Sequence, residues 1–142
     1  MPYLLHLKRK IDCAKVTNPL GMQLEKLAPV FSIAKLDSFA GVDFTKPFVF
    51  AAATDGEFSL VCPAELMPPK AIALSPGWKG FRVAGVLDFS LVGILAKLSA
   101  VLAGEKIGIF AVSTYITDYI FVKEEEFARA LSALEAAGYS IV

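Results

Sequence analysis

Apolar and polar positions alternate most regularly in the C-terminal half of the chain. Residues 81–86 alternate with a period of two and predict a strand. Apolar residues then recur at helical spacing and predict a helix whose buried stripe is made of Leu91, Ile94, Leu95, Leu98, Val101 and Leu102. Gly104 lies where helices commonly end in a left-handed glycine. Two more apolar runs, residues 107–113 and 119–122, predict strands joined by a turn near residues 116–118.

A second helix and a last strand follow. Three glutamates, Glu124–Glu126, place negative charge at the first turn, where the helix dipole favours it. The buried stripe of this helix is predicted to be Phe127, Ala130, Leu131 and Leu134. Gly138 ends the helix, and residues 139–142 predict a strand. The order β-α-β-β-α-β over residues 81–142 predicts an α+β, ferredoxin-like fold with both helices on one face of an antiparallel sheet.

The N-terminal half contains strand signals but little room for helices. Residues 30–36 suit a strand, and residues 48–53 and 58–61 flank an Asp-Gly turn that predicts a hairpin. The segment between residues 36 and 47 is too short for a packed helix, and residues 63–69 allow at most a short one before two prolines. Ser75, Pro76 and Gly77 are the best candidate for a linker.

The two halves resemble each other. Residues 50–54 and 58–66 match residues 110–114 and 119–127, with a spacing that differs by one residue across the hairpin. The match predicts two tandem ferredoxin-like units with antiparallel sheets side by side, the first unit being a degenerate copy. Chance similarity between two apolar hairpins is the alternative. The expected organisation is therefore an N-terminal segment of undefined structure at 1–28, a degenerate unit at 29–74 and a complete unit at 75–142.

Composition narrows the function. Apolar residues make up 56% of the chain and charged residues 20%, which supplies a core and differs from a disordered chain. The formal net charge is zero, so no long-range field attracts nucleic acid or an anionic membrane. No run approaches the roughly 18 apolar residues of a membrane span, and no secretory signal is recognisable. We therefore expect a cytoplasmic protein that binds neither nucleic acid nor membrane.

No group of residues with the spacing of a catalytic or metal site stands out. The single histidine, His6, lies in the N-terminal segment, and Cys13 and Cys62 have no metal-binding spacing. Phosphate-loop and nucleophile motifs are absent from the sequence. Arg82 is expected in mid-strand, too early for an anion-binding loop. We therefore expect no enzyme activity, no metal and no cofactor.

The start of the first predicted helix is the best candidate for a ligand site. The first amides of a helix have no intrahelical partner and carry the positive end of the dipole, which suits a carboxylate. Gly85 and Gly93 allow close approach to the backbone. Asp88 is suited either to accept from an ammonium group or to cap the helix, and Ser90 has the same two interpretations. Gly93 inside a helix would cost roughly 1 kcal/mol relative to alanine, which indicates a packing or ligand reason for it.

Residues 83–96 and 109–119, with residues 58–63, resemble small bacterial proteins with tandem ACT domains and, more distantly, the eukaryotic ACT-type cytosolic arginine sensor. The resemblance implies ferredoxin-like modules that pair side by side and bind amino acids at their interface. It also implies that Thr114 is a ligand contact and Asp118 an acidic one. Leu91 and Val92 stand where the sensor is more polar, so we expect an apolar pocket rather than an arginine site.

The sequence therefore predicts a non-catalytic regulatory or sensor module, with a small-molecule amino acid or related metabolite as ligand and a homodimer as the expected assembly. A hairpin turn at residues 113–118 and a cap at Asp88 are the simpler roles for the same residues. The alternative function is a structural or protein-interaction protein without a ligand site. The expected ligand-binding set comprises Gly85, Asp88, Phe89, Ser90, Leu91, Val92, Gly93, Ser113, Thr114, Tyr115 and Asp118.

Overall fold

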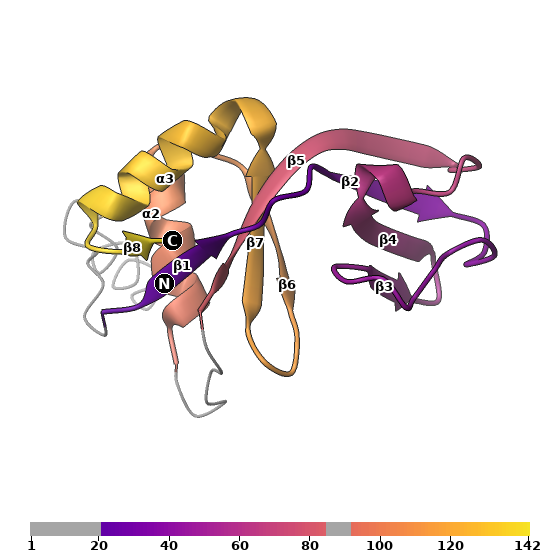
Figure 1. Ribbon diagram of the computed structural model, residues 1–142, viewed down its shortest axis with the longest axis horizontal. Coiled ribbons are helices and arrows are strands. Elements are labelled where there is room, and N and C mark those ends of the chain that lie inside the picture. Colours follow the sequence, from indigo (N-terminus) through magenta and orange to yellow (C-terminus); the bar gives the residue numbers. More distant parts are fainter. Residues whose placement is uncertain (1–20, 85–91) are drawn as a thin grey trace, which may run out of the picture.

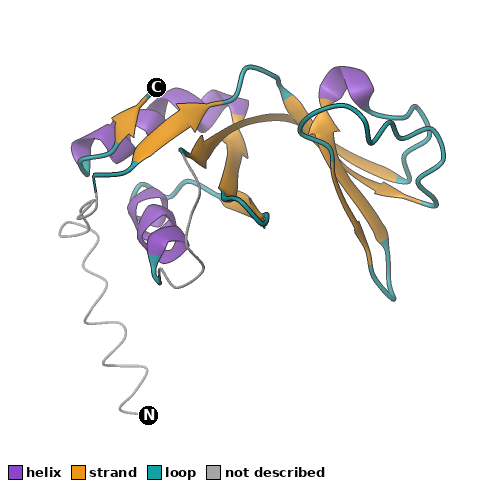
Figure 2. Cartoon of the chain, turned by 60° about the horizontal axis from the view of Figure 1, so that its bottom comes forward, coloured by secondary structure: helices purple, strands orange, loops and turns teal. Residues whose placement is uncertain are grey.

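The computed structural model describes residues 21–84 and 92–142, which form an α+β fold with a mixed sheet (Figure 1). The strands within these ranges are β1 Gln23–Lys26, β2 Phe31–Leu36, β3 Phe50–Ala53, β4 Phe58–Pro63, β5 Ala73–Val83, β6 Ile109–Ser113, β7 Asp118–Lys123 and β8 Ser140–Ile141. The helices are α2 Ile94–Gly104 and α3 Phe127–Ala136, with short 3-10 helices η2 Ala64–Leu66 and η3 Glu124–Glu126. Figure 2 shows both α-helices at one end of the molecule and the β3–β4 hairpin at the other.

The long strand β5 joins the two ends of the sheet. The strand order is β3-β4-β2-β5-β1-β8, and β7 pairs with β5 and β6. The first half of β5 pairs with β2 and the second half with β7. The prediction of a linker at residues 75–77 is wrong, because these residues lie inside β5. Gly77 has a left-handed φ of 77° near a register shift in the β2 pairing, so the strand bends there without being interrupted.

The N-terminal segment contributes one strand to the sheet. The sequence left its structure open, and the structure places β1 between β5 and β8. The β1–β8 pair is parallel, whereas the other strand pairs among the described residues are antiparallel. Leu24 of β1 is fully buried in the core under the helices. The chain therefore uses residues from before the first hairpin to complete the C-terminal half of the sheet.

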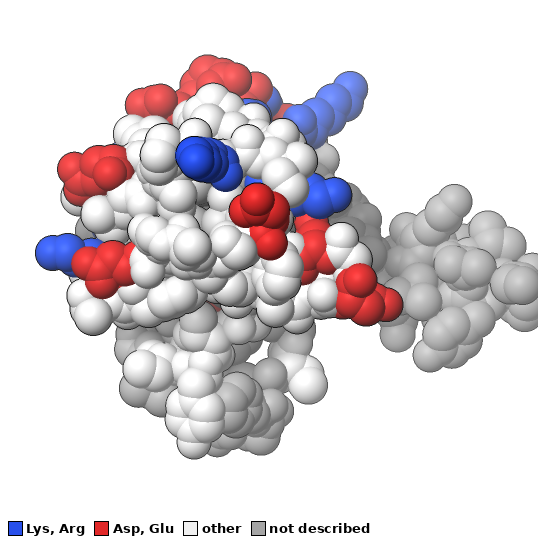
Figure 3. All heavy atoms as spheres, turned by 90° about the vertical axis from the view of Figure 1, so that its right-hand side faces the viewer, with Lys and Arg blue, Asp and Glu red and all other residues white. Residues whose placement is uncertain are grey.

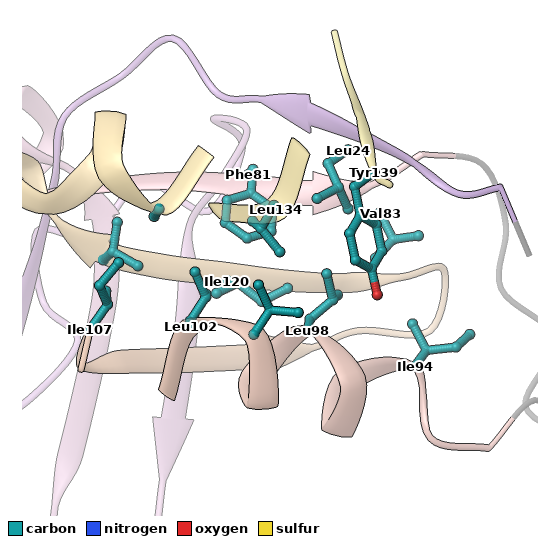
Figure 4. Close-up of a cluster of buried hydrophobic side chains, with 13 residues drawn as sticks. Leu24, Phe81, Val83, Ile94, Leu98, Leu102, Ile107, Ile120, Leu134 and Tyr139 are labelled. Carbon is teal, nitrogen blue, oxygen red and sulfur yellow. The ribbon is translucent and has the colours of Figure 1, made fainter. Parts of the chain in front are cut away.

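The main core lies between the two α-helices and one face of the sheet (Figure 4). It is formed by fully or nearly fully buried apolar residues: Leu24, Phe81, Val83, Ile94, Leu98, Val101, Leu102, Ile107, Ile120, Val122, Ala130, Leu134 and Tyr139. The predicted stripes on both helices are largely confirmed by this cluster. Each fully buried leucine contributes roughly 1.5–3 kcal/mol of transfer free energy.

An aromatic cluster fills the space on the opposite face of the same strands. Phe121 of β7 stacks on Phe110 at a centroid distance of 4.6 Å and meets Phe31 of β2 edge-on at 4.9 Å. The ring centroid of Phe50 in β3 lies 4.9 Å from that of Tyr119. These contacts join the β2–β3–β4 part of the sheet to the β6–β7 hairpin, face to face.

The helix ends follow the predicted glycines only in part. Gly138 has a φ of 97° one residue beyond the C-cap of α3, which confirms the predicted stop. Gly104, in contrast, is the last residue of α2 rather than a left-handed cap. The left-handed residue after α2 is Lys106, with a φ of 58°. The helix therefore runs slightly further than the glycine position predicts.

The two hairpins share the same local structure at a constant offset. In the first, the Thr54 amide donates to the Glu57 carbonyl at 2.9 Å, and in the second the Thr114 amide donates to the Thr117 carbonyl at 2.9 Å. Each hairpin is followed directly by a 3-10 helix, η2 or η3. Equivalent residues differ by sixty in number throughout, so the expected one-residue difference across the hairpin is wrong. As predicted, residues 37–49 hold turns and no helix, and η2 is short.

Candidate functional site

The structure describes six of the eleven predicted site residues, which lie before α2 and in or beside the β6–β7 turn. Val92 and Gly93 precede α2, Ser113 ends β6, and Asp118 begins β7. Thr114 and Tyr115 lie in the turn between those strands. The remaining predicted residues lie outside the described ranges: Gly85, Asp88, Phe89, Ser90 and Leu91. Figures 1 and 4 show the β6–β7 turn and the first turn of α2 at the same end of the helix-covered sheet.

Helix α2 begins later than the sequence predicts. Its first residue is Ile94 and its N-cap is Gly93, with a left-handed φ of 82°. The predicted start of this helix is therefore too early, and Gly93 is its N-cap instead of an interior residue. A glycine at this position permits a φ that other residues adopt only at a cost. The reason for Gly93 is thus the sharp turn into the helix.

The first amides of α2 have no hydrogen-bond partner among the described residues. The first intrahelical bond runs from the Lys97 amide to the Gly93 carbonyl at 2.9 Å, so the amides of residues 94–96 point out of the helix. No side-chain hydrogen bond caps this end within the described residues. These amides carry the positive end of the dipole and suit a carboxylate.

The hairpin turn is held by its own polar side chains. The Ser113 hydroxyl donates to Asp118 Oδ1 at 2.6 Å, and the Thr114 hydroxyl donates to the Thr117 carbonyl at 3.0 Å. These bonds confirm the prediction of a hairpin turn. Oδ1 of Asp118 is therefore bonded within the hairpin, while its second carboxylate oxygen accepts no hydrogen bond from the described residues.

Sequence reasoning missed the residue that ties the hairpin to β5. Thr117 is 4% exposed, and its hydroxyl donates to the Val83 carbonyl at 2.8 Å. Val83 is the last residue of β5, so this bond fixes the turn against the end of the strand that leads toward α2. The sequence signal was a threonine in a turn, which is common and carries no information about a partner 34 residues away.

Apolar side chains are exposed around this end of the fold. Val92 is 89% exposed, Tyr115 82% and Ile116 54%. Exposed large apolar residues near polar groups are typical of binding surfaces. This end of the fold therefore offers the backbone amides of the first turn of α2, the carboxylate of Asp118 and exposed apolar side chains.

Metal binding and membrane insertion through a helix find no support in the described residues. Among residues 21–84 and 92–142, no group of three or more His, Cys, Asp and Glu side chains is placed to hold a metal ion. No helix in the described part of the chain is long and apolar enough to cross a membrane. On the face shown in Figure 3, acidic and basic side chains are interspersed, with no large area of one sign.

Comparison with known proteins identifies the class of this fold. Residues 73–136 match the ACT domain family. The structure is similar to protein Atu0741 from Agrobacterium tumefaciens, with 30% identity, a TM-score of 0.76 and coverage of 85% of this chain and 92% of that one. The chain therefore belongs to the same protein family as Atu0741, and its residues 73–136 form an ACT domain.

More distant structures share the fold. A Vibrio cholerae protein of unknown function, VC0802, described as a possible transport protein, has 21% identity and a TM-score of 0.65, covering 83% of this chain and 91% of that one. The regulatory subunit of aspartate kinase from Thermus thermophilus has 16% identity and a TM-score of 0.55, covering 87% and 99%. No curated protein matches the chain.

Proposed function

We propose that this protein is a non-catalytic regulatory module that binds an amino acid, or a related small metabolite, between the start of α2 and the β6–β7 hairpin. One observation carries the proposal. The uncapped amides of α2 lie at the same end of an ACT domain as a hairpin turn that Thr117 ties to β5. Aspartate kinase regulatory regions, which share this fold, support a regulatory role.

Each part of an amino acid has a matching group at this end of the fold. The amides of residues 94–96 suit its carboxylate. Asp118, held by Ser113, suits its ammonium group, because a fixed carboxylate accepts charged hydrogen bonds strongly. Val92 and Tyr115 offer exposed apolar surface for a side chain. An aliphatic or aromatic amino acid therefore fits better than arginine.

The wider organisation is part of the same proposal. The matching hairpins, each followed by a 3-10 helix, support two tandem ACT-like units at 29–74 and 75–142, the first without packed helices. Side-by-side pairing of these units in a homodimer would place two sites in one assembly. The neutral net charge supports a cytoplasmic protein without nucleic acid or membrane partners.

Thermal unfolding in the presence of each of the twenty amino acids tests the ligand. A ligand that binds the folded state raises the melting temperature, by mass action. We expect at least one aliphatic or aromatic amino acid to raise it at millimolar concentration. If none of the twenty does, the amino-acid proposal is wrong.

A matched pair of variants then tests the position of the site. Thr114→Val removes the hydroxyl from the hairpin beside α2, and Thr54→Val removes its counterpart from the other hairpin, where it donates to Glu57. Thr114→Val loses the bonds of its hydroxyl to the Thr117 carbonyl and amide, and Thr54→Val loses those to the Glu57 carbonyl and to the Gly56 and Glu57 amides, so Thr54→Val should destabilise the protein at least as much. We expect only Thr114→Val to weaken binding by calorimetry, by about tenfold, or 1.4 kcal/mol. Equal affinities would place the ligand elsewhere.

The alternative is a protein-interaction role without a ligand. Strand β6 pairs only with β7 among the described strands and carries no charged residue over Ile109–Ser113. An apolar edge without charge, proline or bulge favours pairing with another strand. A dimer that dissociates when Ala111→Lys is introduced, combined with no amino-acid response, would favour this function.

A further inference from the structure

An apolar cavity, chemically different from the site proposed above, lies between the two hairpins. It has a volume of about 310 Å³ and opens between the β3–β4 hairpin and β6. Its lining is apolar apart from one hydroxyl: Ile33, Phe50, Ala51, Ala52, Ser59, Val61, Phe110, Ala111 and Val112. No charged side chain contributes to it.

The cavity arises from small residues on the first hairpin. Ala52 of β3 and Ser59 of β4 are directly opposite each other in the sheet. Their equivalents in the second hairpin, sixty residues later, are Val112 and Tyr119. The side chains of the β3–β4 hairpin are therefore smaller here than those of the β6–β7 hairpin. The space between the β3–β4 hairpin and β6 is only partly filled as a result.

Aromatic rings close the inner end of this space. The ring centroid of Phe50 lies 4.9 Å from that of Tyr119 and 6.1 Å from that of Phe121. Phe110 stacks on Phe121 at a centroid distance of 4.6 Å. Phe50 and Phe110 thus form walls that are held by their neighbours and do not collapse into the gap. Preformed apolar pockets of this size with a few polar groups are typical of small-molecule sites.

We propose that this cavity binds an uncharged ligand with a flat aromatic or branched aliphatic group. The lack of charge in the lining excludes an ionised group, because it would lose hydration without a partner. The two aromatic walls favour an aromatic ring, which gains edge or stacking contacts with them. The Ser59 hydroxyl, for which the described residues offer no bond, is available to one polar atom of the ligand.

The dye N-phenyl-1-naphthylamine, an uncharged aromatic amine that fluoresces in apolar surroundings, is a direct probe. We expect saturable binding to the full-length protein. Ala52→Leu fills the cavity and should raise the dissociation constant by about tenfold or more. Ala53→Leu is the matched control, because the next residue on β3 has its side chain on the other face and does not line the cavity.

Two further variants keep the test decisive. If Ala52→Leu fails to fold, Val112→Phe fills the same cavity from β6. Thr114→Val should leave dye binding unchanged, since it alters the other site. The proposal is overturned if the dye shows no saturable binding to the wild-type protein, or if Ala52→Leu and Ala53→Leu bind it equally.

Discussion

Gly80→Ala is expected to destabilise the protein strongly, although it adds one methyl group. Gly80 is buried in β5 opposite Phe121 of β7. A Cβ atom at this position would lie 2.8 Å from both Cδ1 and Cε1 of Phe121, and 3.3 Å from the Ile120 carbonyl oxygen. Contacts between carbon atoms are favourable only at roughly 3.5–4.0 Å, so the ring or the strand has to move.

The surroundings of Phe121 decide the size of the effect. The ring is fully buried, stacked on Phe110 at 4.6 Å and in contact with Phe31 at 4.9 Å. Overpacking of this kind costs about 1–3 kcal/mol, and an off-rotamer side chain about 0.5–1.5 kcal/mol. We expect a loss of about 2–3 kcal/mol in unfolding free energy. For a domain of this size that corresponds to a fall of roughly 6–12 °C in melting temperature.

Equilibrium urea unfolding, followed by circular dichroism, measures this loss. Gly108→Ala is the control, because it adds the same methyl group where the new Cβ atom would have no atom of the described residues within 4 Å. The φ of Gly108 is also outside the left-handed region. It should change the free energy by less than about 1 kcal/mol.

A double mutant isolates the clash itself. Phe121→Leu alone loses buried area, but it also removes the ring that the new methyl group meets. Gly80→Ala combined with Phe121→Leu should therefore cost at least about 1 kcal/mol less than the sum of the single changes. Additive effects, or a Gly80→Ala protein within about 0.5 kcal/mol of the wild type, would refute the steric explanation.

Three further predictions follow from single residues. Thr117→Val should lower the unfolding free energy by about 1–3 kcal/mol, because the Val83 carbonyl loses the hydroxyl that donates to it. Thr117→Ser keeps the hydroxyl and should cost less, and urea unfolding compares the two variants. Gly93→Ala should cost about 1–2 kcal/mol in the same assay from its left-handed φ, because no atom of the described residues would lie within 4 Å of the new methyl group. Burial raises the pKa of the Cys62 thiol from 9.0 to about 11, so Cys62 in the native protein should resist thiol reagents at pH 8, which mass spectrometry of the labelled peptides measures separately from Cys13. Because the folded state holds this proton longer than the unfolded state, stability measured against pH should fall as the pH rises from about 9 to 11.

The predicted elements and the observed ones differ mainly at junctions. Residues 75–77 read as a linker because serine, proline and glycine commonly interrupt secondary structure. In the fold, pairing with β2 holds them in β5, and Gly77 absorbs the bend. The start of α2 was likewise set too early, since apolar spacing alone extended the stripe back to Leu91.

The candidate site was only partly visible in the sequence. The hairpin turn could be located because it lies between two strand signals, whereas Thr114 and Asp118 were singled out as ligand contacts by the resemblance to ACT-type proteins. The bond from Thr117 to Val83 could not, because it joins residues that are brought together by strand pairing rather than by local spacing. The apolar cavity was also invisible, since it depends on two hairpins packing face to face.

The sequence by itself determined most of the strands and both long helices, their order, the buried helix stripes and the likeness to ACT domains, because periodicity and turn residues act locally along the chain. Only the tertiary structure decided that β1 lies between β5 and β8, that one strand is shared by both ends of the sheet, and that small residues at Ala52 and Ser59 leave a cavity. These features depend on contacts between segments far apart in the chain. The energies of strand pairing and side-chain packing determine which of these contacts form, and the local sequence pattern does not reveal them.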